Sequence, residues 1–296
     1  MIQPHRLACV TVFAAAGFMA AALAAGVPVP ARVSSSVRPK TPADPAPAAG
    51  IDQFPKAAAS YLVTLDGVVL WERASDVPRA PGSLAKIMAA LVLLEGDWRG
   101  DAVVTVSARA ASAEGARVGL RAGDRVRAEA LLTAMLVRSA NDACLALAER
   151  AGGNVDTFVA RMNARAVEMK LRATRFADPT GLDAKGQASS ARDLLRLTEA
   201  ALKQPVFARL TALKEATIVT ESGRSLPVET TNVLLGRLPG AKGVKTGFTA
   251  KAGKCLVALA ERDGHRVLAV LLDSPDRWWA ASAMIEEAFR AAGKAR

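Results

Sequence analysis

The sequence predicts an α+β fold, in which strands from both ends of the folded region form one antiparallel sheet. Two hairpin patterns support this prediction, because β-rich runs meet at Asp66-Gly67 and again at Asp263-Gly264, and Asp-Gly favours a tight hairpin turn. Between the hairpins, apolar residues recur with mainly helical spacing. We therefore expect helices to flank the sheet and an adjoining all-helical lobe to lie beside it.

The expected strands are 61–65 paired with 68–71, and 255–260 paired with 266–272. The run 87–94 is apolar all round, which is typical of a buried helix. Asp142 is expected to cap the third helix, because it precedes an apolar run that stops at two glycines. The expected helices are 87–94, 128–137, 142–149, one that carries 155–162, one that opens with a capping-box-like pattern at 190–193, and one over 276–291.

Residues 1–25 have the pattern of an export signal. Arg6 supplies a positive charge, an almost unbroken apolar run follows, and Ala22-Leu23-Ala24 offers the small-x-small pattern that signal peptidases cut. The apolar run is also long enough to span a bilayer, so an uncleaved anchor is the alternative. We expect an exported protein, periplasmic or extracytoplasmic, that is either released or tethered to the membrane through this segment.

Residues 26–57 are rich in Pro, Ala and Ser, a composition that favours an extended linker over a packed core. This leaves 58–296 as the folded domain. Its apolar content is ample for a core, but only 4% of the chain is aromatic, so Ala, Leu and Val must fill the interior.

The formal net charge of +11 raises the question of an anionic partner. Nucleic acid is disfavoured, because the Lys and Arg residues are scattered and no aromatic residues alternate with them. Attraction to an anionic cell envelope and a merely solvated basic surface are weighed evenly. Cys144 and Cys255 both lie in apolar runs, which favours buried free thiols over a disulfide.

The few histidines restrict the available chemistry. His5 lies in the export segment, and His265 follows a predicted turn, so a Ser-His-Asp arrangement is poorly supported. No cluster of His, Cys and carboxylates has metal-ligand spacing, and the sequence calls for no metal and no cofactor. If the protein is a serine enzyme, its base should be a lysine.

Ser83 and Lys86 form the first of three ordered motifs. Ser83 follows Pro81-Gly82 and opens the buried apolar run, so we expect it in the first turn of a helix, where unpaired amides favour negative charge. Lys86 lies three residues on, beside Ser83 on the same helix face. Burial would favour a neutral amine that accepts the hydroxyl proton as Ser83 attacks a carbonyl. The alternative is a plain helix cap with a solvated lysine.

Ser139 and Asn141 form the second motif, in a short connection between two apolar helices. A hydroxyl near Lys86 can pass a proton to a leaving amine, and the Asn141 amide can bind a substrate carbonyl. The alternative is a helix-linking turn with polar caps.

Lys245, Thr246 and Gly247 form the third motif, followed by Phe248. In an edge strand, Gly247 lets a substrate backbone approach closely, while Lys245 and Thr246 hold a carboxylate. The Phe248 amide, with that of Ser83, can form an oxyanion hole. The alternative is an ordinary surface turn, but that reading does not explain the order of the three motifs.

The sequence resembles the serine D-Ala-D-Ala carboxypeptidases, the low-molecular-mass penicillin-binding proteins of peptidase family S11. The nucleophile segment differs from the common pattern at Ala85, where a Thr is usual. The resemblance covers the chain from about Tyr61 to the last helix. The segments that carry it are 81–88, 136–147, 178–183, 190–194, 231–235 and 243–255.

The resemblance implies a β-lactamase/transpeptidase-like fold for residues 58–296, which would form a penicillin-binding catalytic domain. Its substrates would be peptidoglycan stem peptides that end in D-Ala-D-Ala, and β-lactam antibiotics would inhibit it. Ser83 would be the acyl-enzyme nucleophile and Lys86 its base, with Ser139 as a proton relay. Asn141 would assist, and Lys245 would bind the substrate carboxylate.

Three alternatives stay open to different degrees. The chain ends one helix after the second hairpin, and Thr231 stands where some relatives carry an Arg; both features resemble the DD-endopeptidase branch. Carboxypeptidase is preferred as the commoner activity.

A class A β-lactamase needs a further Glu, and no convincing Glu-x-x-Leu-Asn pattern lies between Asn141 and Lys245. A non-catalytic wall-binding or antibiotic-sensing domain is the remaining alternative.

Overall fold

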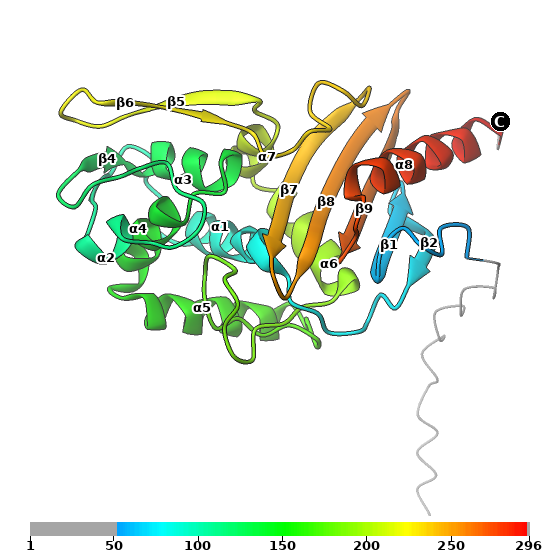
Figure 1. The fold of residues 1–296 in the computed structure, drawn as a ribbon, viewed down its shortest axis with the longest axis horizontal. Helices are drawn as coiled ribbons and strands as arrows, with labels where there is room; N and C mark the ends of the chain where they lie inside the picture. The colour runs from blue at the N-terminus through cyan, green and yellow to red at the C-terminus, as the bar shows by residue number, and fades with distance from the viewer. Residues whose placement is uncertain (1–51, 295–296) are drawn as a thin grey trace, which may run out of the picture. The chain divides into compact units, whose positions relative to one another are not determined.

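The computed structural model describes residues 52–294, and in this part five strands form one antiparallel sheet in the order β2-β1-β9-β8-β7 (Figure 1). The first strand of the folded region pairs with the last, Ser60 opposite Leu272, which confirms a sheet built from both ends of the region. The predicted export segment 1–25, and the predicted linker as far as residue 51, lie outside the described residues. The strands of the sheet are β1 (Ser60–Leu65), β2 (Val68–Arg73), β7 (Ala241–Thr249), β8 (Gly253–Arg262) and β9 (His265–Leu272).

Both predicted hairpin turns have the left-handed backbone that Asp-Gly allows. Asp66 and Gly67 have φ values of +51° and +83°, and Asp263 and Gly264 have +52° and +79°. The Asp66 carboxylate lies 2.7 Å from Nδ1 of His265 and accepts a hydrogen bond from the Arg266 amide at 2.8 Å. His265 therefore belongs to the contact between the two hairpins.

The helices of the described part confirm every predicted one, with boundaries that shift by a few residues. Two short helices, α2 and α7, were not predicted, because so few residues show no readable apolar period. The helical elements are η1 (Gly82–Leu84, a 3-10 turn), α1 (Ala85–Glu95), α2 (Ala108–Ala111), α3 (Ala128–Val137), α4 (Asn141–Gly152), α5 (Val155–Glu168), α6 (Ala191–Leu202), α7 (Pro205–Thr211) and α8 (Arg277–Lys294).

The expected cap at Asp142 is wrong. Helix α4 begins after Ala140, which makes no side-chain cap, and Asp142 lies inside the first turn. Its carboxylate instead accepts hydrogen bonds from the amides of Val118, Gly119 and Leu120 at 2.9–3.2 Å. Asp142 thus fastens a distant loop to the start of α4, a role that local spacing does not reveal.

The α+β class is confirmed, but the lobe beside the sheet is not all-helical. It also holds two short hairpins, which pair β3 (Val103–Thr105) with β4 (Arg125–Arg127) and β5 (Glu215–Val219) with β6 (Ser225–Glu229). Three-residue strands carry no readable alternation, and Pro227 weakens the strand pattern of β6.

Buried apolar residues lie on both faces of the sheet. On one face, Tyr61, Leu256 and Leu271 pack against Met284 and Ile285 of α8, which crosses that face in Figure 1. On the other face, inward residues of the same strands pack against α1 and α6 and continue into the helical lobe. Because β8 and β9 are covered on both faces, they read as almost continuous apolar runs.

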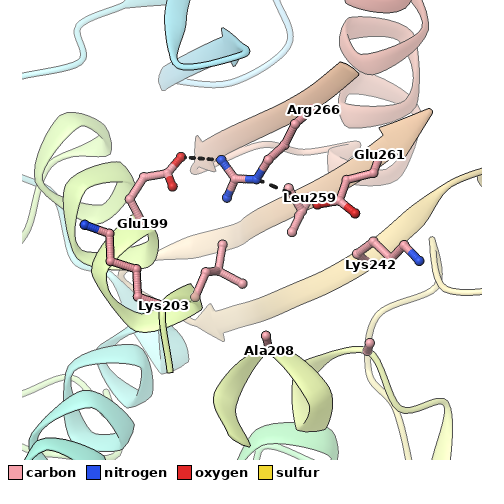
Figure 2. Close-up of a pocket in the computed structure, with 9 residues that line it drawn as sticks. Glu199, Lys203, Ala208, Lys242, Leu259, Glu261 and Arg266 are labelled. Atoms are coloured by element: carbon pink, nitrogen blue, oxygen red, sulfur yellow. Dashed lines mark hydrogen bonds and ion pairs between the residues drawn. The ribbon is translucent and has the colours of Figure 1, made fainter. Parts of the chain in front are cut away.

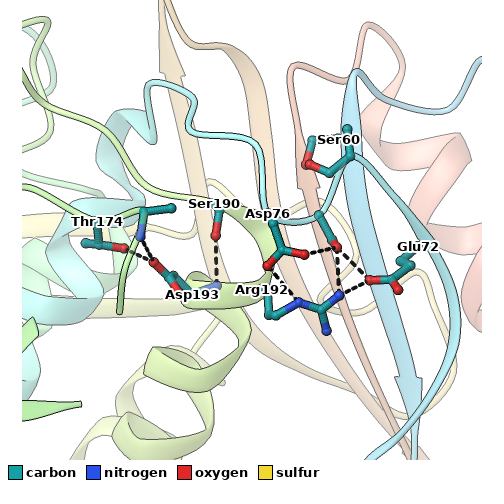
Figure 3. Close-up of polar contacts among 10 residues, drawn as sticks. Ser60, Glu72, Asp76, Thr174, Ser190, Arg192 and Asp193 are labelled. Carbon is teal, nitrogen blue, oxygen red and sulfur yellow. Dashed lines mark hydrogen bonds and ion pairs between the residues drawn. The ribbon is translucent and has the colours of Figure 1, made fainter. Parts of the chain in front are cut away.

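The start of α6 is tied to two other segments by charged contacts (Figure 3). The Arg192 guanidinium donates to Asp76 and Ser75 at 2.9 Å each and also pairs with Glu72, at the exit of β2. Asp193 accepts hydrogen bonds from the Ala173 amide and the Thr174 hydroxyl at 2.8 Å each. These contacts hold α6 against the hairpin β1–β2 and against the segment that enters the site described next.

Candidate active site

The structure brings the three sequence motifs together from separate elements. Ser83 lies in η1, Ser139 and Asn141 lie where α3 connects to α4, and Lys245 lies on the edge strand β7. The Lys86 amine is 3.3 Å from the Ser83 hydroxyl and 2.6 Å from Oδ1 of Asn141. Each motif therefore contributes to one cluster, as the sequence predicted.

Ser83 lies just ahead of the α-helix, in a 3-10 turn, and not in the first α-helical turn that the sequence predicted. Gly82 has a φ of +54°, and a Cβ built on it would lie 3.2 Å from the Phe248 amide nitrogen. A glycine is needed at this point because the turn is both left-handed and close to β7. The Ser83 side chain remains partly accessible.

Lys86 is fully buried, and its amine has three acceptors within reach. They are the Ser83 hydroxyl at 3.3 Å, Oδ1 of Asn141 at 2.6 Å and the backbone carbonyl of Thr180 at 2.5 Å. A protonated amine donates to all three. A neutral amine has two N–H groups and one lone pair, and only the Ser83 hydroxyl can donate to that lone pair. The geometry thus directs the basic lone pair of neutral Lys86 toward Ser83.

Burial favours the neutral form of both lysines in the cluster. It lowers the pKa of Lys86 to about 8, an effect that Cys144, Asp178 and Asp142 oppose. The pKa of Lys245 is also lowered well below its ordinary value, chiefly by burial and then by the positive charge of Lys86. A lysine with a pKa near 8 can serve as a base at mildly alkaline pH.

Ser139 contacts Lys245, whereas the sequence placed it near Lys86. Its hydroxyl accepts a hydrogen bond from the Lys245 amine at 2.8 Å, and within residues 52–294 no hydrogen bond joins it to Lys86. Ser139 has a φ of +64°, a left-handed conformation that is costly for a residue with a Cβ. This conformation lets α4 begin two residues after Ser139, with Asn141 in its first turn.

The amide of Asn141 is oriented by its neighbours. Nδ2 donates to the backbone carbonyl of Glu114 at 2.6 Å, which leaves Oδ1 to accept from Lys86. The backbone amide of Asn141 also donates to the carbonyl of Ala116 at 2.7 Å. The carbonyls of the loop 114–116 therefore hold Asn141 in place through two hydrogen bonds.

Lys245 is almost completely buried, at 1% exposure, and donates to Ser139 and to the carbonyl of Thr246 at 2.9 Å. Its amine is therefore already engaged by two acceptors. The Thr246 hydroxyl lies 2.6 Å from the hydroxyl of Thr231, which occupies the position where the sequence analysis noted an absent Arg.

The strand β7 passes close to the turn that holds Ser83. A Cβ built on Gly247 would lie 3.0 Å from the Pro81 carbonyl oxygen and 3.2 Å from the Ser83 amide nitrogen. Gly247 is thus needed for packing as well as for access to the strand edge. The same approach brings the amides of Ser83 and Phe248 close together, while the Phe248 side chain is 65% exposed.

Two contributors were missed by the sequence analysis. The carbonyl of Thr180 accepts from Lys86, and a backbone acceptor has no side-chain signature, although 178–183 was noted among the family-typical segments. Arg277, at the start of α8, donates to the carbonyls of Gly247 and Cys255 at 2.7 and 3.1 Å. Arg277 therefore stabilises the edge strand β7 from helix α8, the last helix of the domain.

Two other features lie apart from this cluster. A cavity of about 340 Å³ between α6, α7 and the strands β7–β9 is crossed by the ion pair of Glu199 with Arg266 at 2.7 Å, and none of the predicted site residues line it (Figure 2). Cys144 and Cys255 are both buried free thiols, as the sequence favoured.

Comparisons with known proteins agree on one family. Residues 51–276 match the Peptidase S11 family, described as D-alanyl-D-alanine carboxypeptidase. The chain is 34% identical over 221 residues to the D-alanyl-D-alanine carboxypeptidase DacF of Bacillus subtilis, covering 73% of this chain and 57% of that protein. It is 32% identical over 248 residues to a D-alanyl-D-alanine endopeptidase of Pseudomonas aeruginosa, covering 82% and 80%. The solved DD-transpeptidase of Streptomyces K15 superposes with a TM-score of 0.75 at 30% identity, covering 79% of this chain and 97% of that one.

Proposed function

Because this chain belongs to the D-alanyl-D-alanine carboxypeptidase family, we propose that it removes the terminal D-Ala from peptidoglycan stem peptides through an acyl-enzyme on Ser83. One observation carries the proposal: the fully buried Lys86 amine lies 3.3 Å from the Ser83 hydroxyl. Its two other partners, Oδ1 of Asn141 and the carbonyl of Thr180, cannot donate a hydrogen bond to its lone pair. This is the arrangement that a serine nucleophile needs when its base is a lysine.

Acylation would begin with proton transfer from the Ser83 hydroxyl to neutral Lys86, as the oxygen attacks the carbonyl of the penultimate D-Ala. The negative charge that develops on that carbonyl oxygen would be stabilised by the amides of Ser83 and Phe248. Collapse of the tetrahedral intermediate breaks the peptide bond and needs a proton for the leaving amine. That proton is the one that Lys86 took from Ser83, and Ser139, which contacts Lys245, is proposed to relay it to the amine.

Deacylation would follow when water attacks the ester on Ser83 and gives its proton to Lys86, which is neutral again, and Lys86 returns a proton to the Ser83 oxygen as the ester bond breaks. The part of the chain that the structure describes offers no carboxylate hydrogen-bonded to Ser83 that would activate this water. Penicillins would therefore acylate Ser83 and leave slowly, which makes β-lactam antibiotics inhibitors. Fast turnover of penicillin by the pure protein would contradict this assignment.

Binding of the terminal carboxylate would depend on Lys245, Thr246 and the neighbouring Thr231. Lys245 is buried and donates to the Ser139 hydroxyl, so it would act on the carboxylate through that hydroxyl and, once the anion favours its protonated form, through its charge. The hydroxyls of Thr231 and Thr246 lie 2.6 Å apart and can both face an anion. A free terminal carboxylate would be held less tightly than by an arginine at 231.

This last point favours a second candidate, a D-alanyl-D-alanine endopeptidase that cleaves cross-links. A cross-linked substrate offers a longer acceptor strand in place of a short terminal D-Ala, so it can make contacts beyond the carboxylate site. The similarity to the Pseudomonas aeruginosa endopeptidase is consistent with this activity.

Mass analysis of purified peptidoglycan fragments after incubation separates the two candidates. Loss of one terminal alanine from pentapeptides supports the carboxypeptidase, and conversion of cross-linked dimers to monomers supports the endopeptidase. If neither product forms and fluorescent penicillin does not label the wild type, the protein is a non-catalytic wall-binding or antibiotic-sensing domain.

We propose that the protein acts outside the cytoplasm, since its family acts on the cell wall and residues 1–25 have an export pattern. Residues 26–57 would be a linker and 58–296 the catalytic domain. Within residues 52–294, no helix has both the length and the apolar character that crossing a membrane requires. The net charge of +11 would favour association with an anionic envelope.

A further inference from the structure

We propose that Asp178 is a positioning residue for Lys86, an inference that rests on the proposed role of Lys86 as base. Its carboxylate shapes the segment 178–182, which places the backbone carbonyl of Thr180 against the Lys86 amine. The segment thereby fixes the direction of the amine toward Ser83, although Asp178 itself touches neither residue.

A single carboxylate oxygen organises this segment. Oδ1 of Asp178 accepts hydrogen bonds from the amides of Thr180, Gly181 and Leu182 at 2.8, 2.9 and 3.2 Å. The Thr180 hydroxyl donates to the same oxygen. Four donors on one acceptor turn the chain sharply, which directs the Thr180 carbonyl away from Asp178 and toward Lys86 at 2.5 Å.

The turn also lies directly against the nucleophile. Gly181 has a φ of +89°, and a Cβ built there would lie 2.0 Å from the Gly82 carbonyl oxygen and 2.8 Å from the Ser83 amide nitrogen. The segment therefore contacts both the residue that carries the nucleophile and, through Thr180, the residue that carries the base. A shift of the segment would change the geometry between Ser83 and Lys86.

Asp178 also acts on Lys86 through its charge. The titratable groups that face Lys86 are Asp178, Asp142 and Cys144, with Lys245 opposite on β7. Asp178 and Asp142 both raise the pKa of the amine against the effect of burial. Removal of the Asp178 charge would lower the pKa of Lys86 further, so the amine would become neutral at a lower pH.

The test compares Asp178→Asn and Asp178→Ala with the control Asp183→Asn. Asp183 is a carboxylate of the same loop, and it is exposed and bonded to the Thr249 hydroxyl at 2.6 Å and the Lys251 amide at 3.2 Å. Its replacement by Asn removes the same charge, from a carboxylate that accepts two hydrogen bonds where Asp178 accepts four. The readouts are the melting temperature and the second-order rate constant of acylation by a fluorescent penicillin from pH 6 to 10.

The Asp178→Ala variant is expected to lose about tenfold or more in the rate constant, because the Thr180 carbonyl is no longer held. The Asp178→Asn variant keeps an oxygen acceptor, so it should recover most of the rate at high pH but reach half of its maximum at a lower pH than wild type. The control should keep the wild-type midpoint.

A wild-type rate in Asp178→Ala, or equal midpoints in wild type and Asp178→Asn, would overturn the inference while the proposed function stands. A midpoint that moves equally in the control would also overturn it, since the effect would then be one of net charge. If the wild type is not acylated at all, the proposed function fails instead. An NMR titration of the Lys86 amine in wild type and Asp178→Asn then decides the inference alone: a lower pKa supports it and an unchanged pKa refutes it.

Discussion

The amine of Lys245 donates a hydrogen bond to the hydroxyl of Ser139 at 2.8 Å, and this contact joins the edge strand β7 to the connection between α3 and α4. Ser139 reaches it from a left-handed conformation, with φ at +64°. A residue that keeps such a conformation despite its cost is held there by its surroundings, here two helices and a buried lysine. The contact therefore holds the Ser139 hydroxyl against Lys245, while Lys86 bonds to Asn141 of the same connection.

Replacement of Ser139 should separate stability from activity. Both Ser139→Ala and Ser139→Gly remove the hydroxyl, so both should lose a similar factor in peptide hydrolysis. Glycine accepts the left-handed backbone without a Cβ penalty, so Ser139→Gly should be more stable than Ser139→Ala by about 1 kcal/mol. Chemical denaturation of the two variants measures this difference, and an equal free energy of unfolding would contradict the claim of strain.

Acylation should depend on pH through the Lys86 amine. Because burial lowers the pKa of Lys86 to about 8, the rate constant for acylation by penicillin should rise with pH and reach its half-maximum near that value. The Lys86→Arg variant carries a cation that stays protonated, so its rate constant should fall about a hundredfold or more. Stopped-flow measurement of both proteins across pH 6–10 is decisive, and a flat wild-type profile would count against Lys86 as the base.

The same lysine should make the stability of the protein depend on pH. The pKa of Lys86 is about 8 in the folded protein and 10.5 for an ordinary lysine, so between these values the unfolded chain binds more protons. The free energy of unfolding should therefore gain about 3 kcal/mol from this residue as the pH rises from below 8 to above 10.5.

The variant Lys86→Met has no amine to titrate at this position. The free energy of unfolding of the wild type, relative to that of the variant, should therefore rise over the same pH window. Urea denaturation at several pH values measures that difference, in which the titration of all other groups cancels. A difference that stays constant with pH would mean that Lys86 keeps an ordinary pKa when folded.

Substrate preference should respond to residue 231. The Thr231→Arg variant would place a guanidinium near the Thr246 hydroxyl, where it can pair with a terminal carboxylate. We expect a lower KM for a pentapeptide ending in D-Ala-D-Ala with a smaller change in kcat, and no such gain in the control Thr231→Val. An unchanged KM in Thr231→Arg would show that the carboxylate does not bind next to Thr246.

Much of this site could be predicted because its signals are local. The Asp-Gly pairs specify their own turns, and the spacing of Ser83 and Lys86 is a short-range relation on adjoining helical turns. The remaining features depend on contacts between distant segments. That Ser139 pairs with Lys245, and that Asp142 binds the loop 118–120, follow from how α4 packs against its neighbours.

The least predictable contributors act through the backbone. The Thr180 carbonyl would accept from Lys86 whatever side chain residue 180 carried, so the identity of that residue gives no signal. Gly181 does leave a trace in the sequence, but its purpose becomes clear only when the Gly82 carbonyl is seen against it. The short strands β3 and β4 were missed for a similar reason, since pairing in space defines them more than composition does.

The most direct test is mass spectrometry of the intact protein after incubation with penicillin, followed by peptide mapping. Wild type should gain the mass of one penicillin on Ser83, and Ser83→Ala should gain none. Lys86→Met should gain the same adduct only after a much longer incubation. An adduct on another residue, or no adduct on a folded wild-type protein, would contradict the proposal that a neutral buried lysine activates Ser83.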